Sequence, residues 1–246
     1  MKVQKVAVIT GGASGIGLAI TRLLARKGWN VIQADKNGDV YDFEPNTNRF
    51  VCDVSSPDDI DNLFEWVRKE RGRLDLLVTC AGVHSATPIE KTSVSEFERL
   101  SDVNMRGVWL TCEAAMSLLI ESNGSIVTIG SDVALLPDKD AILYSASKAW
   151  VVNFTKALAL YGADHGFRAN CVCPGQTDTP FLHAAFGNDR KAVSACAAVN
   201  PMKRMATPHE IAKAIWMVHD NAFMNGAVVP VDGGYSIQAV QEPPKP

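Results

Sequence analysis

A glycine-rich turn between a strand and a helix does most to limit the folds open to this chain. The apolar run 5–10 leads directly into Gly11-Gly12-Ala13-Ser14-Gly15-Ile16-Gly17, and residues 18–27 then have the pattern of a helix. Glycines in such a turn let backbone N–H groups and the positive end of a helix approach a phosphate without side-chain hindrance. The turn therefore predicts a dinucleotide-binding unit. An ordinary flexible turn is the alternative.

The rest of the chain alternates between strand-like apolar runs and helical segments. The predicted strands are residues 5–10, 30–35, 49–52, 74–80, 124–130, 168–173 and 228–231. Near-continuous runs of Val, Ile and Leu are typical of parallel strands buried on both faces. Ser56-Pro57 predicts a helix start, and Ser93–Glu96 and Thr207–Glu210 have capping-box spacing. We expect an α/β fold in which residues 1–246 form a single domain, a doubly wound parallel sheet (Rossmann fold) with helices on both faces.

Composition excludes several classes of partner. Apolar residues make up 47% of the 246 residues and charged ones 21%, which is ordinary for a globular protein. The formal net charge of −3 gives no reason to expect a nucleic acid or an anionic membrane as partner. No apolar run approaches the ~20 residues of a membrane span, and the N-terminus leads into a strand rather than a signal peptide. We expect a cytoplasmic protein without a metal site. Its six cysteines are expected to be reduced core residues rather than disulfides or metal ligands.

Tyr144 and Lys148 are a second informative pair. Residues 146–162 have the pattern of a helix, and positions four apart lie on one helix face. A phenol ionises near pH 10 in water. A cation about 5 Å away, at an effective dielectric constant of about 20, favours the phenolate by roughly 3 kcal/mol. The pair can therefore form a proton-transfer group, although a helix with one exposed Tyr and one exposed Lys would show the same spacing.

The glycine spacing Gly11-x-x-x-Gly15-x-Gly17 and the Tyr144-x-x-x-Lys148 pair together resemble the classical short-chain dehydrogenase/reductase family over almost the whole chain. The resemblance implies a catalytic set of Asn104, Ser131, Tyr144 and Lys148. In such a set Ser131 positions the reacting oxygen and Tyr144 takes its proton. Lys148 lowers the tyrosine pKa and binds the nicotinamide ribose, and Asn104 holds a water of the proton relay.

NAD is the predicted cofactor. Asp35 follows the glycines by about twenty residues, where a carboxylate can accept hydrogen bonds from the adenosine ribose and would repel the extra phosphate of NADP. Lys36 leaves some use of NADP open, and a plain turn residue is the alternative for Asp35. The implied cofactor contacts are Gly11, Ser14, Gly15, Ile16, Gly17, Asp35, Asp53, Val54, Cys80, Ala81, Gly82, Tyr144, Lys148, Pro174, Gly175, Thr177 and Thr179. Asp53 is also typical of a helix start.

One motif departs from the family pattern. Thr79-Cys80-Ala81-Gly82 stands where the family usually has Asn-Asn-Ala-Gly. The family's asparagines mainly tie the central sheet together, so the departure bears on local hydrogen bonding more than on activity. Ala81-Gly82 still permits close approach of the cofactor.

The substrate side is predicted from loops. Residues 178–201 are expected to form a flap over the substrate, with a pair of surface helices as the alternative. His84 and His183 are candidate substrate contacts beside Ser131 and Tyr144, although a loop histidine is also typical of an ordinary surface. The loops 128–132 and 174–179 are similar to those of dihydro-dihydroxybenzoate dehydrogenases. Residues 241–246, with three prolines, predict a loose C-terminal tail.

These features predict an NAD-dependent oxidoreductase that transfers a hydride between nicotinamide and a secondary alcohol or ketone, with a cyclic diol or sugar-like compound among the candidate substrates. A dinucleotide-sensing protein without catalysis is the alternative, but a sensor would need Asp35 and not Ser131. A nucleotide-sugar epimerase or dehydratase would have a longer chain and other glycine spacing. Helices at 105–122 and 146–162 carry apolar residues on more than one face, which predicts a homodimer or homotetramer.

Overall fold

In the computed structural model, residues 4–38 and 45–238 are described, and they contain one parallel sheet of seven strands. The strands are β1 (Val6–Thr10), β2 (Asn30–Asp35), β3 (Thr47–Val51), β4 (Leu76–Thr79), β5 (Ser125–Ile129), β6 (Arg168–Pro174) and β7 (Val228–Val231). Their order is β3-β2-β1-β4-β5-β6-β7, and all pairs are parallel. The predicted fold class is confirmed. The predicted tail at 241–246 lies outside the described residues.

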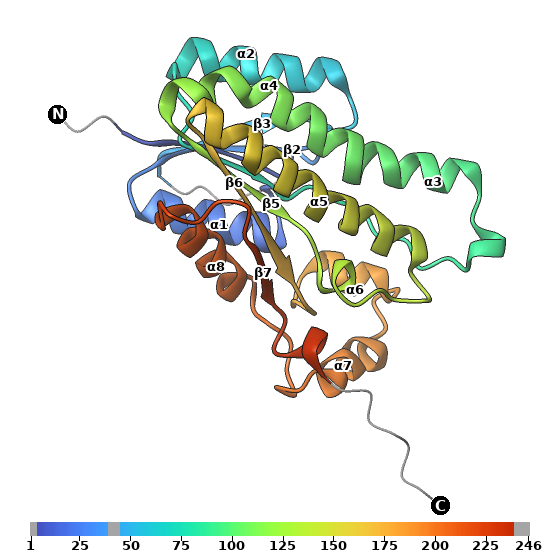
Figure 1. Ribbon diagram of the computed structural model, residues 1–246. Coiled ribbons are helices and arrows are strands. Elements are labelled where there is room, and N and C mark those ends of the chain that lie inside the picture. Colours follow the sequence, from blue (N-terminus) through green and yellow to red (C-terminus); the bar gives the residue numbers. More distant parts are fainter. Residues whose placement is uncertain (1–3, 39–44, 239–246) are drawn as a thin grey trace, which may run out of the picture.

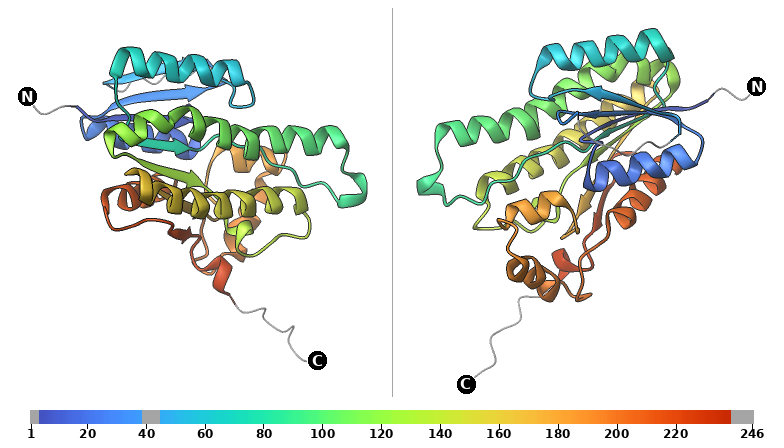
Figure 2. Two further views of the ribbon diagram at one scale, coloured as in Figure 1. Left: turned by 45° about the horizontal axis from the view of Figure 1, so that its top comes forward. Right: turned by 180° about the vertical axis from the view of Figure 1, so that it is seen from behind.

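Helices cover both faces of this sheet (Figures 1 and 2). They are α1 (Gly15–Arg26), α2 (Pro57–Arg71), α3 (Val94–Ser101), α4 (Gly107–Ser122), α5 (Ile142–His165), α6 (Pro180–Ala185), α7 (Arg190–Val199) and α8 (Pro208–Asp220). α1 and α8 pack on one face, and α2, α4 and α5 cover the other (Figure 2). α6 and α7 lie beyond the carboxyl ends of the strands (Figure 1). The order of strands reverses between β1 and β4, which is where open α/β sheets bind ligands.

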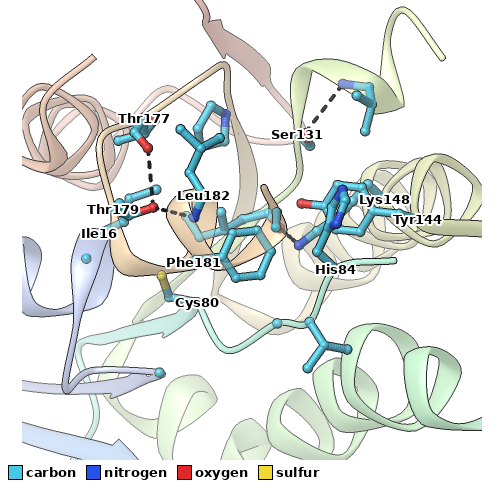
Figure 3. A pocket seen from close by; sticks show the side chains of 18 of the residues that line it. Ile16, Cys80, His84, Ser131, Tyr144, Lys148, Thr177, Thr179, Phe181 and Leu182 are labelled. Atoms are coloured by element: carbon cyan, nitrogen blue, oxygen red, sulfur yellow. Dashed lines mark hydrogen bonds between the residues drawn. The ribbon is translucent and has the colours of Figure 1, made fainter. Parts of the chain in front are cut away.

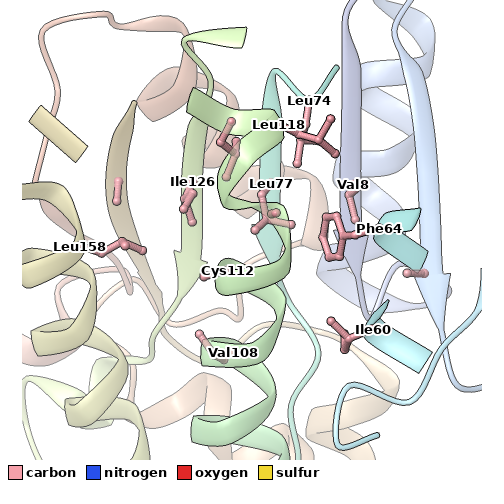
Figure 4. Close-up of a cluster of buried hydrophobic side chains, with 14 of the residues drawn as sticks. Val8, Ile60, Phe64, Leu74, Leu77, Val108, Cys112, Leu118, Ile126 and Leu158 are labelled. Atoms are coloured by element: carbon pink, nitrogen blue, oxygen red, sulfur yellow. The ribbon is translucent and has the colours of Figure 1, made fainter. Parts of the chain in front are cut away.

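Two apolar layers explain why the central strands contain continuous apolar runs. Ala7, Val8 and Ile9 are all fully buried, because alternate side chains of β1 enter the layers on opposite faces of the sheet. Phe64 of α2 and Leu118 of α4 fill the layer that Figure 4 shows. Burial of such side chains contributes about 1.5–3 kcal/mol each to folding.

The helix starts follow the predicted caps with one difference. Ser56 accepts a hydrogen bond from Asp59 N, and Thr207 and Glu210 form a complete capping box. Ser93 caps α3 through Glu96 N, but the Glu96 carboxylate binds the Arg99 guanidinium instead of the cap backbone. A charge-assisted bidentate pair is the stronger interaction, so the capping box at Ser93 is only half formed.

Two helices differ in their bounds from the prediction. The helix predicted from residue 146 begins at Ile142 as α5, so Tyr144 lies in its first turn rather than before it. The helix predicted from residue 105 begins at Gly107 as α4, after a π-helical turn at Asp102–Arg106. Such turns are frequent at functional sites.

The buried side chain of His219, from α8, lies next to the amino end of β5. The glycine turn lies at the opposite, carboxyl end of the strands. His219 Nδ1 is 2.6 Å from Ser125 Oγ, and its ring packs edge-on against Trp29 with 5.1 Å between centroids. Burial lowers the pKa of His219 to about 4, and the nearby positive charges of Lys5 and Arg168 act in the same direction. The folded protein therefore holds His219 neutral.

We predict that His219 makes stability depend on pH. Its folded pKa lies below the ordinary value of 6.5, so the unfolded state binds more protons between about pH 6.5 and pH 4, and stability falls as the pH falls through that window. Urea unfolding should show a loss of about 2 kcal/mol from this group between about pH 7 and pH 5. His219→Gln, which cannot titrate, should lose that part of the slope. The exposed His209→Gln is the matched control. Equal slopes in wild type and His219→Gln would contradict the prediction.

Candidate active site

Glycines in the turn after β1 allow close contact between the turn, the end of β4 and the start of α1. Gly11 and Gly15 have positive φ angles of 62° and 49°, which favour glycine. A Cβ at Gly11 would lie 2.8 Å from Ala81 N, so only glycine allows the end of β4 to come this close. A Cβ at Gly17 would lie 2.0 Å from Gly11 O. Gly17 therefore permits α1 to start directly on the turn.

A cavity of ≈ 670 Å³ runs along the carboxyl ends of the strands. Every predicted cofactor contact except Gly17 lines it: Gly11, Ser14, Gly15, Ile16, Asp35, Asp53, Val54, Cys80, Ala81, Gly82, Tyr144, Lys148, Pro174, Gly175, Thr177 and Thr179. Ser131 and His84 line it as well, whereas Asn104 and His183 do not. The structure thus joins the glycine turn and the Tyr144–Lys148 pair in one cavity, although Ile16 and Tyr144 are 128 residues apart in the chain.

Two carboxylates lie at the β2–β3 end of the cavity. Asp35 Oδ2 accepts a hydrogen bond from Ala13 N at 3.0 Å, which fixes the end of β2 to the glycine turn. Asp53 Oδ1 accepts from Ser55 N and Ser55 Oγ, and the side-chain bond lowers the pKa of Asp53. Carboxylate oxygens next to a glycine cradle fit the hydroxyl groups of an adenosine ribose, with backbone N–H groups for a pyrophosphate. The described residues therefore fit a dinucleotide.

Tyr144, Lys148 and Ser131 form the polar centre at the other end (Figure 3). Tyr144 and Lys148, one turn apart on α5, are only 8% and 6% exposed. Lys148 Nζ donates to Ile129 O at 2.9 Å, a bond to the end of β5, and lies 5.8 Å from the centroid of the Tyr144 ring. Ser131 lies two residues after this strand end. One strand and one helix therefore fix all three side chains.

Burial dominates the titration of this centre. It raises the pKa of Tyr144, and the negative charge of Asp132 acts in the same direction, while a hydrogen bond from Ser131 opposes both. Burial also lowers the pKa of Lys148. Burial therefore places the Tyr144 pKa above its ordinary value, and the lowering expected from Lys148 stays a prediction. Additional positive charge beside the phenol would favour its ionisation.

Asn104 lies behind the cavity in the π-helical turn. It is fully buried, its Oδ1 accepts from Val83 N at 2.9 Å, and its Nδ2 donates to Val83 O at 2.9 Å and to Ser147 Oγ at 3.2 Å. Ser147 Oγ in turn donates to Tyr144 O. Asn104 therefore ties the segment after β4 to the first turns of α5. Its assignment to a water relay stays a prediction.

The departure at the end of β4 is visible in the hydrogen bonds. Thr79 Oγ1 is buried and has no partner among the described residues. Cys80 N donates instead to Thr10 Oγ1 at 3.2 Å, which links β4 to β1. Cys80 itself lines the cavity, near Ile16 of the glycine turn (Figure 3). All six cysteines of the chain are free thiols.

The helices α6 and α7 supply an apolar wall above this centre. Phe181, Leu182 and Phe186 of the α6 segment line the cavity. The His84 ring packs 4.7 Å from that of Tyr144 and 6.2 Å from that of Phe181, and burial lowers its pKa. His183, by contrast, points away and pairs with Asp178 at 2.7 Å. Of the two candidate histidines, the structure brings only His84 to the site.

Several lining residues are not among the predicted site residues. Asp132 lies near the loops expected to face the nicotinamide and directly follows Ser131, so the sequence places it close to the site. Gln176 lies inside the Pro-Gly loop and was likewise close to predicted contacts. Tyr235, after β7, reaches the cavity only through the fold, and nothing local in the sequence indicates that.

Within residues 4–38 and 45–238, no helix combines the length and apolarity needed to cross a membrane. Nor do three potential metal-binding side chains come together in this part of the chain.

Comparison with known proteins agrees with this geometry. The family model described as enoyl-(acyl carrier protein) reductase matches residues 11–236. Human 3-oxoacyl-[acyl-carrier-protein] reductase is 33% identical over 240 residues, covering 95% of this chain and 99% of that protein. Cis-4-hydroxycyclohexanecarboxylate dehydrogenase of Sinomonas cyclohexanicum is 34% identical over 248 residues, with coverage of 95% and 97%. The structure of Thermoplasma acidophilum aldohexose dehydrogenase superimposes with a TM-score of 0.90 at 33% identity and covers 98% of each chain.

The fold, the dinucleotide cavity and these relatives define an NAD(P)-dependent oxidoreductase that acts on an alcohol or a ketone. The chain belongs to the classical short-chain dehydrogenase/reductase family. The narrower resemblance to dihydro-dihydroxybenzoate dehydrogenases gains no specific support from these comparisons.

Proposed function

We propose that this chain interconverts a secondary alcohol and its ketone, with Tyr144 as the proton-transfer group and NAD preferred over NADP. One observation carries the proposal. Tyr144, Lys148 and Ser131 line the same cavity as the glycine turn and Asp35, so a dinucleotide held at one end reaches the reactive phenol at the other. A dinucleotide sensor would need only the first half of that cavity.

The residues of the cavity divide into binding and reacting groups. Backbone groups of Gly11–Gly17 would hold the pyrophosphate, Asp35 the adenosine ribose, and Lys148 and Thr177 the nicotinamide end. When bound, the oxidised nicotinamide supplies a hydride acceptor and a positive charge that favours the Tyr144 phenolate. Ser131 positions the substrate oxygen, and Tyr144 removes its proton. Lys148 adds a positive charge near the phenol. Asn104 does not line the cavity and supports the site through its hydrogen bonds to Val83 and Ser147.

The preference for NAD rests on the charge at Asp35. Its carboxylate lines the cavity, and its two oxygens accept from Ala13 N and Asn37 N, so it is held in place. Asp53 adds a second negative charge to this end. The extra phosphate of NADP carries nearly two negative charges and would be repelled there. Lys36 also lines the cavity and opposes this effect.

The substrate is proposed to be a cyclic diol or sugar-like alcohol. Of the similar proteins, one is described as acting on a hydroxycyclohexane carboxylate and another on aldohexoses. Residues 178–201, which contain α6 and α7, supply the apolar wall over Tyr144, and we assign them the role of a substrate flap. His84 and Phe181, whose rings lie near each other and near that of Tyr144, would contact the substrate beside Tyr144.

We also propose a homodimer or homotetramer. Trp109 of α4 and Leu160 and Tyr161 of α5 are 48%, 75% and 48% exposed, on adjacent helices of one face. Trp150 and Phe154 stack on each other beside them, with 4.8 Å between ring centroids. An apolar helix face of this kind is stabilised when another copy covers it.

The first prediction of this proposal concerns the preference for NAD over NADP. We expect kcat/KM with NAD to exceed that with NADP at least tenfold, because repulsion of the phosphate by Asp35 should cost more than about 1.4 kcal/mol. Asp35→Ser should reduce the ratio, since the hydroxyl keeps a polar group without the charge. Initial rates with both cofactors measure it. Equal efficiencies in the wild type would mean that Lys36 accommodates the phosphate, and the interpretation of Asp35 would be wrong.

The second prediction distinguishes an enzyme from a sensor. Tyr144→Phe removes one oxygen and keeps the ring, so NADH binding should persist while turnover falls at least about 100-fold. Lys148→Met removes a charge and a ribose donor, so both NADH binding and turnover should suffer. Fluorescence titration gives the binding constant, and NADH formation from alcohols gives the rate. A Tyr144→Phe variant with more than about a tenth of wild-type activity would remove Tyr144 from the mechanism.

The third prediction concerns assembly. Light scattering should give two or four times the monomer mass of 26.6 kDa at micromolar concentration. Trp109→Glu, which places a charge on the proposed interface, should shift the mass towards the monomer. Val94→Glu, at an exposed apolar residue of α3 rather than of α4 or α5, is the control and should leave the mass unchanged. A wild-type protein of monomer mass would contradict the proposal.

A further inference from the structure

The site contains a buried carboxylate that the proposed mechanism does not use. Asp132 follows Ser131 at the carboxyl end of β5, is 5% exposed, and lines the cavity. No described Lys or Arg forms a salt bridge with it. A charged group in such a position is costly unless a partner satisfies it.

One of the two carboxylate oxygens of Asp132 has hydrogen-bond donors in the protein. Oδ1 accepts hydrogen bonds from Ser131 Oγ and Val133 N, both at 2.9 Å. Both of these bonds end on Oδ1, and no hydrogen bond to Oδ2 comes from another described residue. Burial raises the pKa of Asp132 to about 6, which is the direction expected for a carboxylate that lacks a full set of donors. A donor from the cavity would complete the set.

The position of Asp132 works against the proton transfer itself. Its charge raises the pKa of Tyr144 and thus disfavours the phenolate that alcohol oxidation needs. Burial raises the pKa of Tyr235, which also lines the cavity, and the charge of Asp132 acts in the same direction. A carboxylate that opposes the chemical step would be explained by a role in holding the substrate.

The geometry fits a second hydroxyl next to the reacting one. Ser131 Oγ, which positions the reacting oxygen, donates to Asp132 Oδ1 at 2.9 Å, so the carboxylate that carries the open Oδ2 lies one hydrogen bond from it. Oxygens on adjacent carbon atoms are also separated by about the length of one hydrogen bond. We propose that Asp132 accepts a hydrogen bond from the neighbouring hydroxyl of a vicinal diol, which makes Asp132 a substrate-binding residue and vicinal diols the preferred substrate class. This inference rests on the proposed function.

The surroundings favour a hydroxyl over a cationic group. The Lys148 ammonium is in the same cavity, and an amine beside Asp132 would add a like charge. Asp132 and Tyr235 supply a polar side, whereas Phe181 and Phe186 supply an apolar one. A diol with a hydrocarbon face, such as a cyclic diol, matches both sides.

The test compares matched alcohols. Wild-type kcat/KM for NADH formation should be at least tenfold higher with cyclohexane-1,2-diol and butane-2,3-diol than with cyclohexanol and butan-2-ol, each diol being tried as its separate stereoisomers. Asp132→Ala should abolish that ratio, mainly by raising KM for the diols. Asp132→Asn keeps the shape and the Oδ1 acceptor, so it should fold like wild type and show a reduced ratio.

Asp138→Ala is the matched control. Asp138 is an exposed carboxylate that also lines the cavity, so its removal changes the charge without changing the ratio. The inference is overturned if the wild type prefers monohydric alcohols, if trans-2-aminocyclohexanol is a better substrate than the diol, or if a folded Asp132→Asn or Asp132→Ala variant keeps the full ratio. Failure of the proposed function is distinguishable. It would appear as no NADH formation from any of these alcohols, or as full activity in Tyr144→Phe.

Discussion

Loss of solvation around the Tyr144 phenol and the Lys148 ammonium is the constraint on which the site depends. Both side chains are buried at the end of β5, and burial disfavours the charged form of each. The ammonium is held by the Ile129 carbonyl, which partly replaces lost water. For the phenol, burial and the charge of Asp132 raise the pKa, and the hydrogen bond with Ser131 lowers it. In our account an additional positive charge is supplied with the oxidised cofactor, so that proton transfer is coupled to cofactor binding.

The fold makes this arrangement possible by joining distant segments at one edge of the sheet. The reversal of strand order between β1 and β4 places the glycine turn beside Ala81 and Gly82. A Cβ at Gly82 would lie 3.4 Å from Asn104 Oδ1 and 3.6 Å from Lys148 Nζ, so the chain passes closely over both polar groups. Asn104 then holds Val83 through two hydrogen bonds. Removing a partner from such a buried pair typically costs about 1–3 kcal/mol, which makes the π-helical turn part of the support of the site.

Local patterns in the sequence were enough for the strands, the glycine turn and most helix starts. Continuous apolar runs identify buried parallel strands, and Ser, Thr and Pro mark where helices begin. They were not enough for the π-helical turn at Asp102–Arg106, because its hydrogen bonds to Val83 and Ser147 depend on tertiary contacts. The pairing of Glu96 with Arg99 in place of a second capping bond is a competition that spacing alone does not decide.

For the site, too, sequence spacing does not reveal features that depend on tertiary contacts. The spacing of Tyr144 and Lys148 indicates that they share a helix face, but not that both are buried, and burial raises the Tyr144 pKa. His84 and His183 are alike as loop-adjacent histidines, yet only His84 packs against Tyr144. Asp132 and Tyr235 enter the cavity because β5 and the segment after β7 end at the same edge of the sheet.

Direct titration of Tyr144 tests whether binding of the oxidised cofactor favours ionisation of its phenol. The ultraviolet difference spectrum between wild type and Tyr144→Phe isolates the ionisation of this one phenol, and it can be recorded with and without saturating NAD. We predict that Tyr144 ionises at a distinctly lower pH when NAD is bound, because the bound positive charge offsets the effect of burial. An unchanged midpoint, or a titration that is identical in the two proteins, would contradict the account.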